Sequence, residues 1–246
     1  MDRMIFIAMS GAKESMTAQA INTNNLANAN TTGFRADFHS VMSQQVFGPG
    51  MPSRAYAMVQ PGVVDFSAGS IISTGRDLDV AINGSGWFAV QAPDGSEAYT
   101  RAGSLSVDTA GRLLDRNGNP VLGNAGPVSI PPYSKLQIAS DGTISIQPLG
   151  QSAETLAVID RLKMVNPPQA EMYKGVDALM RHDSGAPLPA DASVKLISGS
   201  LEGSNVSTVG ALVKMIELAR QYERHIKVMK TAEENDQAAA KMIQMS

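Results

Sequence analysis

Hydrophobic residues recur with helical spacing at the two ends of this chain and alternate with polar residues in its middle. At both ends the steps alternate between three and four residues, which places the side chains on one face of a helix. Such a stripe has to be buried against another helix, as in a coiled coil. The stripes consist of Ile5, Met9, Ala12 and Met16 near the N-terminus and Leu212, Met215, Ala219, Tyr222, Ile226 and Met229 near the C-terminus.

The second stripe belongs to an unusually long predicted helix. Residues 208–243 contain no proline and a single glycine, Gly210. A helix over this range would be about 54 Å long at about 1.5 Å per residue, far longer than an average globular helix. Ser204, Asn205 and Ser207 are candidate N-caps immediately before it. We expect other helices to cover this one, because the middle of the chain is too small to do so.

The middle of the chain predicts a mainly antiparallel β domain. Short apolar alternations are separated by turn dipeptides that contain glycine. The turns are predicted at Gly84-Ser85-Gly86, Asp94-Gly95, Ala110-Gly111, Asn117-Gly118 and Asp141-Gly142. The expected strand residues are Leu78, Val80, Ile82, Trp87–Val90, Leu105, Val107, Leu113, Val121, Val128, Ile130, Leu136, Ile138, Ile144, Ile146, Val158, Leu162 and Met164. The fold class is therefore predicted as α+β.

Two less regular regions join these parts. The first helix is expected to end near Asn28, because the Asn and Thr side chains there compete for backbone hydrogen bonds. Gly33 then predicts a left-handed turn, and Phe34 is the first anchor beyond it. After Asp37 we expect a short helical stretch to Phe47 and then a proline-containing connector. The predicted domains are a discontinuous helical domain (1–36 plus 204–246), a connector region (37–73 plus 167–203) and a β domain (74–166).

Composition narrows the classes of function. A net charge of −3 and an aromatic content of 5% give no reason to expect nucleic-acid binding. The absence of cysteine excludes disulfides and cysteine metal sites. His39, His182 and His225 lack the spacing of metal ligands, with His225 placed on the polar side of the last helix. Neither a metal nor a cofactor is expected. No stretch is long enough to span a bilayer, and the apolar run at Met4–Met9 is too short for a signal-peptide core.

Pairs of carboxylates are the best candidates for chemistry. Asp77 with Asp79, or Asp108 with Asp115, have the residue types of a glycosidase acid pair, but Asp is more common in turns and on solvent faces. Residues 115–119 lack the Gly and Glu positions of a calcium loop, which favours a hairpin turn. No catalytic residue is assigned. A secreted peptidoglycan hydrolase is kept as the alternative from another class.

Three groups of short motifs occur in order along nearly the whole chain. They are Ser10-Gly11-Ala12, Asn24–Asn28 and Thr31–Arg35 near the start; Leu78–Ile82, Gly84–Phe88 and Tyr99–Gly103 in the middle; and Gly203–Val206, Met215-Ile216 and Arg220–Glu223 near the end. Together they resemble the signatures of bacterial flagellar rod and hook proteins. The opening residues and the modest length are most similar to the proximal-rod members adjacent to the distal rod. Distal-rod and hook-type proteins are the alternatives within the family.

The resemblance implies a structural subunit of the basal-body rod and no enzymatic activity. Terminal helices of neighbouring subunits would form an inner tube, with the β bodies outside, and the helical assembly would transmit torque across the periplasm. Implied partners are other copies of the chain, neighbouring rod proteins and the flagellar type III export apparatus, with export lacking a cleaved signal peptide. The expected assembly interface comprises Ile5, Met9, Ala12, Met16, Asn25, Leu26, Asn28, Gly33, Phe34, Leu212, Met215, Ala219, Tyr222, Ile226 and Met229.

Simpler interpretations of the same segments stay open. The first helix could lie on a membrane surface, although its polar face offers only Arg3 and Lys13 as cations. The C-terminal stripe could be ordinary core, although the length of the helix argues against this. Residues 22–30 could be a plain linker. We favour a packed turn at a subunit contact, and we expect no membrane insertion.

Overall fold

The computed structural model describes residues 4–45, 55–150 and 156–244. The chain divides into two compact units, and each unit is assembled from segments that are far apart in sequence. We call them the helical unit and the β unit. The helical unit is drawn from Met1–Ala29, Asp37–Asp65 and Val206–Ser246, and the β unit from Asn30–Ala36 and Phe66–Asn205.

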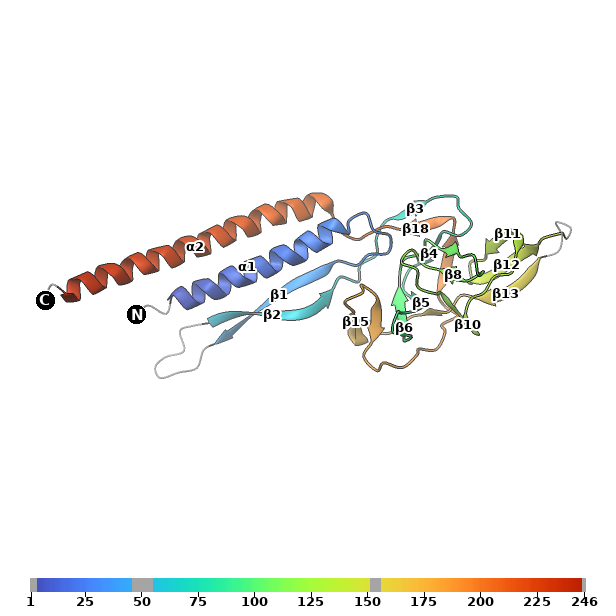
Figure 1. Ribbon diagram of the computed structural model, residues 1–246, viewed down its shortest axis with the longest axis horizontal. Coiled ribbons are helices and arrows are strands. Elements are labelled where there is room, and N and C mark those ends of the chain that lie inside the picture. The colour runs from blue at the N-terminus through green and yellow to red at the C-terminus, as the bar shows by residue number, and fades with distance from the viewer. Residues whose placement is uncertain (1–3, 46–54, 151–155, 245–246) are drawn as a thin grey trace. The chain divides into compact units, whose positions relative to one another are not determined.

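The helical unit combines a pair of helices with a β-hairpin. Helix α1 (Met4–Ala27) and helix α2 (Thr208–Gln244) lie side by side and antiparallel (Figure 1). The hairpin of β1 (Asp37–Gln45) and β2 (Ala55–Val64) contacts α1. The observed range of helix α2 differs from the predicted range, 208–243, by one residue at its C-terminal end.

The helix ends follow local sequence signals. Of the three candidate N-caps for α2, Ser207 makes the capping bond: its Oγ accepts a hydrogen bond from the Gly210 amide at 3.2 Å. Helix α1 ends at Ala27, next to the predicted end at Asn28. Gly33 has a φ of 70°, which confirms the left-handed turn and explains the glycine.

The two helices meet through small side chains, one hydrogen bond and the packing of a histidine ring against a glycine. The Asn22 Nδ2 donates to the Ala211 carbonyl at 2.7 Å, and the His225 ring fills the space beside Gly11, where a Cβ would overlap it. The prediction that His225 lies on the polar side of α2 is therefore wrong, because the ring packs against α1. The most buried apolar or small side chains of the pair are Ala8, Ala12, Ser15 and Ala18 of α1 and Ala211, Leu218 and Ala232 of α2.

Residues 37–45 form a strand, so the predicted helical stretch after Asp37 is wrong. Strand β1 pairs with β2 from Asp37 opposite Val64 to Gln45 opposite Ala55. Phe47 lies outside the described residues. The partner strand β2 begins at Ala55, outside the segment whose local pattern was interpreted, and strand formation depends on such partners more than on local propensity. This is why the local pattern was misleading.

The β unit is built from short antiparallel strands in several small sheets (Figure 1). The largest sheet has the order β14-β5-β6-β16-β15, and a three-stranded sheet has the order β11-β12-β13. Two-stranded pairs within the described residues are β17-β4, β18-β3, β7-β8 and β10-β9. The strands are β3 (Ile71–Ser73), β4 (Val80–Asn83), β5 (Trp87–Gln91), β6 (Glu97–Thr100), β7 (Ser106–Val107), β8 (Leu113–Leu114), β9 (Leu122–Gly123), β10 (Gly126–Pro127), β11 (Tyr133–Ile138), β12 (Thr143–Pro148), β13 (Ala157–Arg161), β14 (Met164–Val165), β15 (Met172–Lys174), β16 (Met180–His182), β17 (Lys195–Ser198) and β18 (Ser200–Glu202), with a 3-10 turn at Gln169–Glu171.

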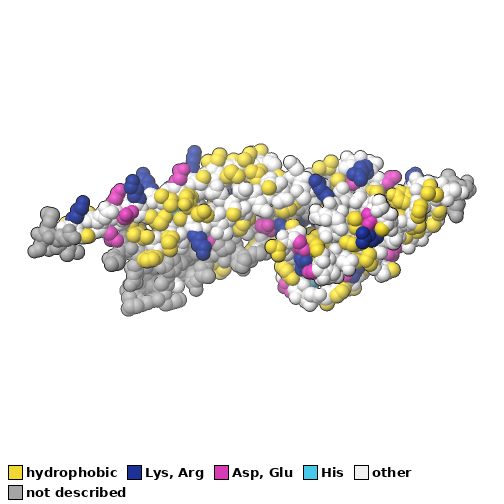
Figure 2. Space-filling model, in the orientation of Figure 1, with side chains coloured by type: hydrophobic (Ala, Val, Ile, Leu, Met, Phe, Trp, Pro, Cys, Tyr) yellow, Lys and Arg dark blue, Asp and Glu magenta, His cyan; other side chains and the backbone are white. Residues whose placement is uncertain are grey.

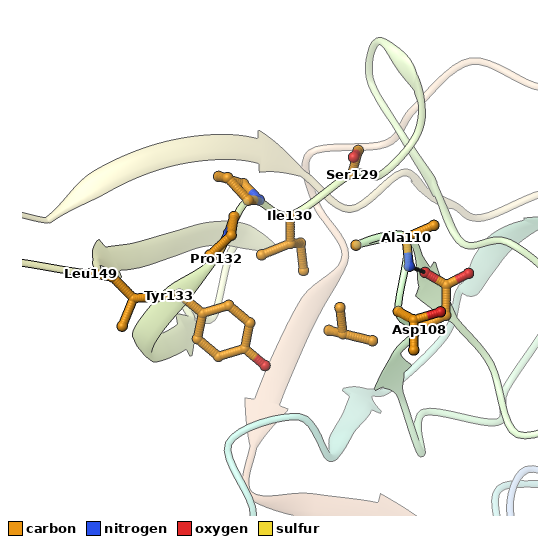
Figure 3. A pocket seen from close by; sticks show the side chains of 11 residues that line it. Asp108, Ala110, Ser129, Ile130, Pro132, Tyr133 and Leu149 are labelled. Carbon is orange, nitrogen blue, oxygen red and sulfur yellow. Dashed lines mark hydrogen bonds between the residues drawn. The ribbon is translucent and has the colours of Figure 1, made fainter.

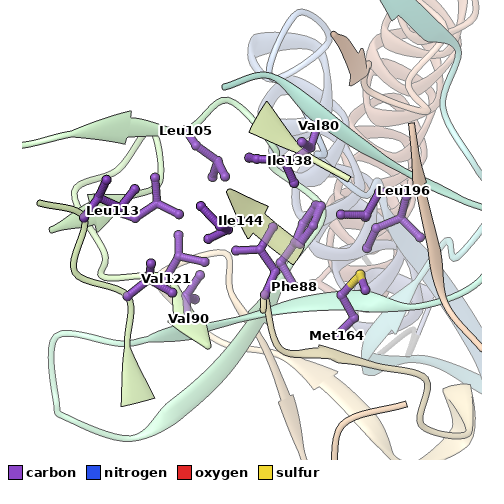
Figure 4. Packing of buried hydrophobic residues seen from close by; sticks show 14 of the residues in the cluster. Val80, Phe88, Val90, Leu105, Leu113, Val121, Ile138, Ile144, Met164 and Leu196 are labelled. Carbon is purple, nitrogen blue, oxygen red and sulfur yellow. The ribbon is translucent and has the colours of Figure 1, made fainter. Parts of the chain in front are cut away.

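The predicted turns and alternations build a single hydrophobic core in this unit (Figure 4). Gly95, Gly111, Gly118 and Gly142, at four of the predicted turns, all have positive φ. The apolar residues between the turns point inward, as the alternation predicts. Val158 is an exception, with its side chain 68% exposed on β13. Core residues labelled in Figure 4 are Val80, Phe88, Val90, Leu105, Leu113, Val121, Ile138, Ile144, Met164 and Leu196.

The two units differ in outline from the three predicted domains. Segment 37–65, expected as part of a connector, belongs to the helical unit. Segment 167–205 belongs to the β unit, where β15 to β18 complete sheets begun much earlier in the chain. Residues 30–36, expected with the helices, also belong to the β unit.

Candidate assembly interface

Large hydrophobic side chains lie on the outside of the helical unit (Figure 2). Monomeric soluble proteins rarely expose extended apolar patches, and such patches mark interaction surfaces. Helices α1 and α2 expose their largest apolar side chains while burying alanines, which is the reverse of an ordinary helical core. The exposed residues are Met4, Phe6, Met9 and Met16 of α1 and Val209, Leu212, Val213, Ile216, Ile226 and Met242 of α2.

The predicted stripe of α1 is divided between the inside and the outside of the helix pair. Ala12 is buried and Ile5 is half-buried. Met9 and Met16 are 54% and 57% exposed. Two of the four predicted residues are therefore available to another molecule, and Ala12 is used within the chain.

The predicted stripe of α2 is divided in the same way. Leu212 and Ile226 are exposed, and the other four positions are half-buried. The residues that α2 buries most deeply are Ala211, Leu218 and Ala232, separated by 7 and 14 positions. Ala211 and Leu218 each lie one position before a predicted residue. The buried face of α2 is therefore rotated from the predicted stripe toward these positions.

Asn25 connects the end of α1 to the start of β1. Its Nδ2 donates to the Asp37 carbonyl at 2.8 Å, and its Oδ1 accepts from the Asp37 amide at 2.9 Å. The side chain thus makes both hydrogen bonds that a neighbouring strand would make. Asn28 is used locally, with its Nδ2 donating to the Asn24 carbonyl at 3.0 Å, and Leu26 is half-buried.

Gly33 and Phe34 lie inside the β unit. The Gly33 amide donates to the Glu202 carbonyl at 2.8 Å, and a Cβ on Gly33 would overlap the Ala102 amide nitrogen. Phe34 is buried, with the Lys174 Nζ 4.1 Å from the centre of its ring, a cation–π geometry. The structure thus assigns these two residues to internal packing, unlike the exposed methionines of α1.

A buried cluster of ionic side chains lies beside these residues. The carboxylate of Glu202 accepts from Arg35 Nη2 at 2.6 Å and from Arg101 Nη1 at 3.0 Å, and all three side chains are more than nine-tenths buried. Both guanidinium groups lie within 6 Å of the centre of the Trp87 ring, at 5.8 and 5.3 Å. Burial lowers the pKa of the Arg101 guanidinium, and the Glu202 charge opposes this shift. Sequence analysis missed the cluster because its members are far apart in sequence.

The carboxylates considered as candidate acid pairs accept hydrogen bonds within turns. Asp108 lines an open groove of about 480 Å³ together with Tyr133 and Leu149 (Figure 3). Its Oδ1 accepts from the Ala110 amide at 2.9 Å, and a hydrogen bond from the Arg112 amide is the main cause that lowers its pKa. It is the one carboxylate among the residues that line this groove. An acid pair flanking a sugar bond is therefore not formed there.

The other carboxylates that were considered have similar structural roles. The Oδ1 of Asp115 accepts from the Asn117 and Asn119 amides, each at 2.8 Å, which is the turn that we favoured over a calcium loop. Asp79 is buried and accepts from the Thr74 hydroxyl at 2.7 Å. Within residues 4–45, 55–150 and 156–244 no cluster of three metal-ligating side chains occurs. Neither helix, in the part described, has the length and hydropathy needed to cross a bilayer.

Segments near both ends and in the middle of the chain match known protein families. Residues 5–35 match the family described as flagella basal body rod protein, residues 81–146 match the flagellar hook protein FlgE/F/G D1 domain, and residues 197–242 match the flagellar basal body rod FlgEFG protein C-terminal family. The chain is 40% identical to the flagellar basal-body rod protein FlgF of Escherichia coli (strain K12) over 100% of both chains. It is 33% identical to the flagellar basal-body rod protein FlgG of Bacillus subtilis (strain 168), over 94% of this chain and 96% of the relative.

The exposed apolar faces of α1 and α2 are typical of a subunit that packs against other molecules. A chain with this arrangement and with matches to rod families at both ends and in the middle is a rod-type protein. The chain belongs to the flagellar basal-body rod protein family, and it is a structural subunit of the basal body.

Proposed function

We propose that this protein is a subunit of the proximal rod, where copies and neighbouring rod proteins stack helically through their terminal helices. The observation that carries the proposal is the inverted burial of the helical unit, in which Met9, Met16, Leu212 and Ile226 are exposed while alanines are buried. Similarity to FlgF proteins over the full chain supports the proximal position. Repeated contacts of this heterologous kind produce an open helical assembly.

In this assembly the helices of adjacent subunits form an inner tube and the β units an outer layer. Torque is shared among many modest contacts. The subunit reaches the periplasm through the flagellar type III export apparatus without cleavage of its N-terminus. Mass spectrometry of the secreted chain tests that last point, since a shortened N-terminus would contradict it. The chain acts without enzymatic activity, and zymography on peptidoglycan tests this directly.

Cysteine cross-linking tests the proposed contacts, because the chain has no native cysteine. Met16→Cys and Ile226→Cys are expected to yield cross-linked species in purified basal bodies after mild oxidation. Thr109→Cys, at an exposed turn of the β unit, is the control for random collision. Cross-linking of the control alone would contradict the proposed interface. Absence of the chain from purified basal bodies would contradict the rod assignment itself.

A further inference from the structure

The polypeptide chain passes between the helical unit and the β unit only through three short segments of the β unit. The chain passes between the units at residues 29–30, 36–37, 65–66 and 205–206. These crossings lie at the ends of segments 30–36, 66–70 and 200–205, and all three segments belong to the β unit. Any force carried by the backbone from one unit to the other must therefore enter the β unit through these segments.

One residue holds all three segments together. From the first segment, Arg35 binds the Glu202 carboxylate at 2.6 Å and the Gly33 amide donates to the Glu202 carbonyl at 2.8 Å. From the second, the Gly69 amide donates to Glu202 Oε1 at 3.0 Å. Glu202 itself belongs to the third segment, and its other carboxylate oxygen is bound by Arg101 of the β core at 3.0 Å.

Neighbouring contacts join the same three segments. The Ala36 amide donates to Asn205 Oδ1 at 2.8 Å, and Asn205 Nδ2 donates to the Ser67 carbonyl at 3.2 Å. The Gly203 amide donates to the Ser70 carbonyl at 2.8 Å. The close approach requires a glycine, because a Cβ on Gly69 would overlap the Gly203 carbonyl oxygen.

We propose that Glu202, with Arg35 and Arg101, is a positioning cluster that makes the chain crossings respond to force as one body. A buried carboxylate shared by two arginines adds little net stability, but removing the carboxylate leaves uncompensated buried charge and is strongly destabilising to the surrounding structure. Glu202 supplies the one carboxylate that both guanidinium groups bind. Its loss therefore affects both arginines, whereas the loss of one arginine leaves the other contact in place. The cluster would thus distribute the load on one crossing over all of them. This role adds to the proposed rod function, and its solution test does not depend on it.

Hydrogen exchange on the full-length chain tests the proposal. In Glu202→Gln, protection of the Gly33, Gly69 and Gly203 amides is expected to fall together, by about tenfold or more, as a cooperative local opening. Core amides of β5 and β6 should keep their protection. Near-UV circular dichroism of Trp87, the single tryptophan, should weaken because both guanidinium groups lose their fixed place near the ring. Loss of protection at the Gly69 amide alone would show that the segments are independent and would overturn the proposal.

Two further variants separate this role from ordinary stabilisation. Glu97→Gln is the matched control, because it removes a carboxylate that binds Lys163 at 2.7 Å elsewhere in the β unit, and it should leave the three segments protected. The triple change Arg35→Met, Arg101→Met and Glu202→Leu replaces the ions by apolar groups, which often restores stability. We expect recovered thermal stability without recovered joint protection. Full recovery of both would overturn the proposal.

Discussion

The two units of this molecule bury different kinds of side chain. The β unit encloses its large apolar residues, such as Phe88 and Ile144, in one continuous core. The helical unit buries mainly alanine and serine, with Leu218, and exposes large apolar side chains such as Met16 and Leu212. The β unit therefore has a large apolar core of its own, whereas the exposed apolar faces of the helical unit would be buried only in the proposed assembly. In that assembly, folding and subunit contact would depend on different parts of one chain.

The largest effect on the isolated chain is expected from a charge in the β core. Ile144 has no exposed surface, and Ile144→Asp places a carboxylate there without a partner, at a cost of several kcal/mol, about 4 or more. Unfolding in urea, followed by Trp87 fluorescence, should show loss of the β unit's transition. A cooperative transition at the wild-type midpoint would contradict the view that this unit is self-sufficient.

Gly33→Val is expected to destabilise the β unit by roughly 3 kcal/mol, because it combines a left-handed backbone with a steric overlap. Gly118→Val is the matched control. Gly118 also has a positive φ, of 84°, but nothing lies within 4 Å of a Cβ placed there. The difference between the two variants measures the overlap alone. Secretion should be retained in Gly33→Val and incorporation into the rod should fall; equal unfolding midpoints for the two variants would contradict this account.

Met16→Asp and Ile226→Asp repeat the charge substitution on the helical unit. Both side chains are exposed, so the free energy of unfolding should change by no more than about 0.5 kcal/mol. Incorporation into the rod should nevertheless be lost, because the same side chains would be desolvated between subunits. Lys230→Ala, at an exposed position of α2, is the control and should swim normally. Normal swimming by both Asp variants would show that these faces stay in solvent after assembly.

The smallest expected effect is on the pH dependence of the stability of the β unit. In the β unit the pKa values of Asp94, Asp108, Asp141, Asp177 and Asp191 are all lowered, mainly by hydrogen bonds to the carboxylates. Because the folded pKa lies below the unfolded one, the stabilisation is present above about pH 4 and is lost as the pH falls further. Asp141→Asn should therefore reduce the acid sensitivity of the Trp87 transition slightly. An unchanged pH profile would show that these turn bonds contribute nothing measurable.

Much of the fold follows from local signals. Local signals predicted the bounds of α2, the end of α1 and the glycine turns. Capping side chains, the lack of proline and the glycines that favour positive φ each affect only the few residues around them. Strand β1 was not predictable in this way, because it exists only through its pairing with β2. The division of the helical stripes was not either. Ala211 and Leu212 are neighbours on one helix, and only the partner helix decides which of them is inside.

The candidate interface was also predictable only in part. Spacing placed Met9 and Met16 on the α1 stripe but did not predict that they are exposed while Ala12 is buried, and the motif that contains Asn25 could be singled out. The hydrogen bonds of Asn25 to Asp37 could not be foreseen, since they depend on where β1 begins. The contact of Arg35 with Glu202 joins residues 167 positions apart, and nothing in a local pattern relates them.

That separation along the chain sets an order of events in time. The Asp108–Arg112 pair closes a loop of 4 residues, whereas Arg35–Glu202 closes one of 167. Loop closure costs about 0.6 kcal/mol for each doubling of length, so the long contact is disfavoured by roughly 3 kcal/mol until other structure shortens the loop. The hairpins of the β unit should form first, and the Glu202 cluster should close late. For any chain delivered from its N-terminus, Arg35 waits with its charge in water until Glu202 has emerged, and the closing of that contact marks the completion of the β unit.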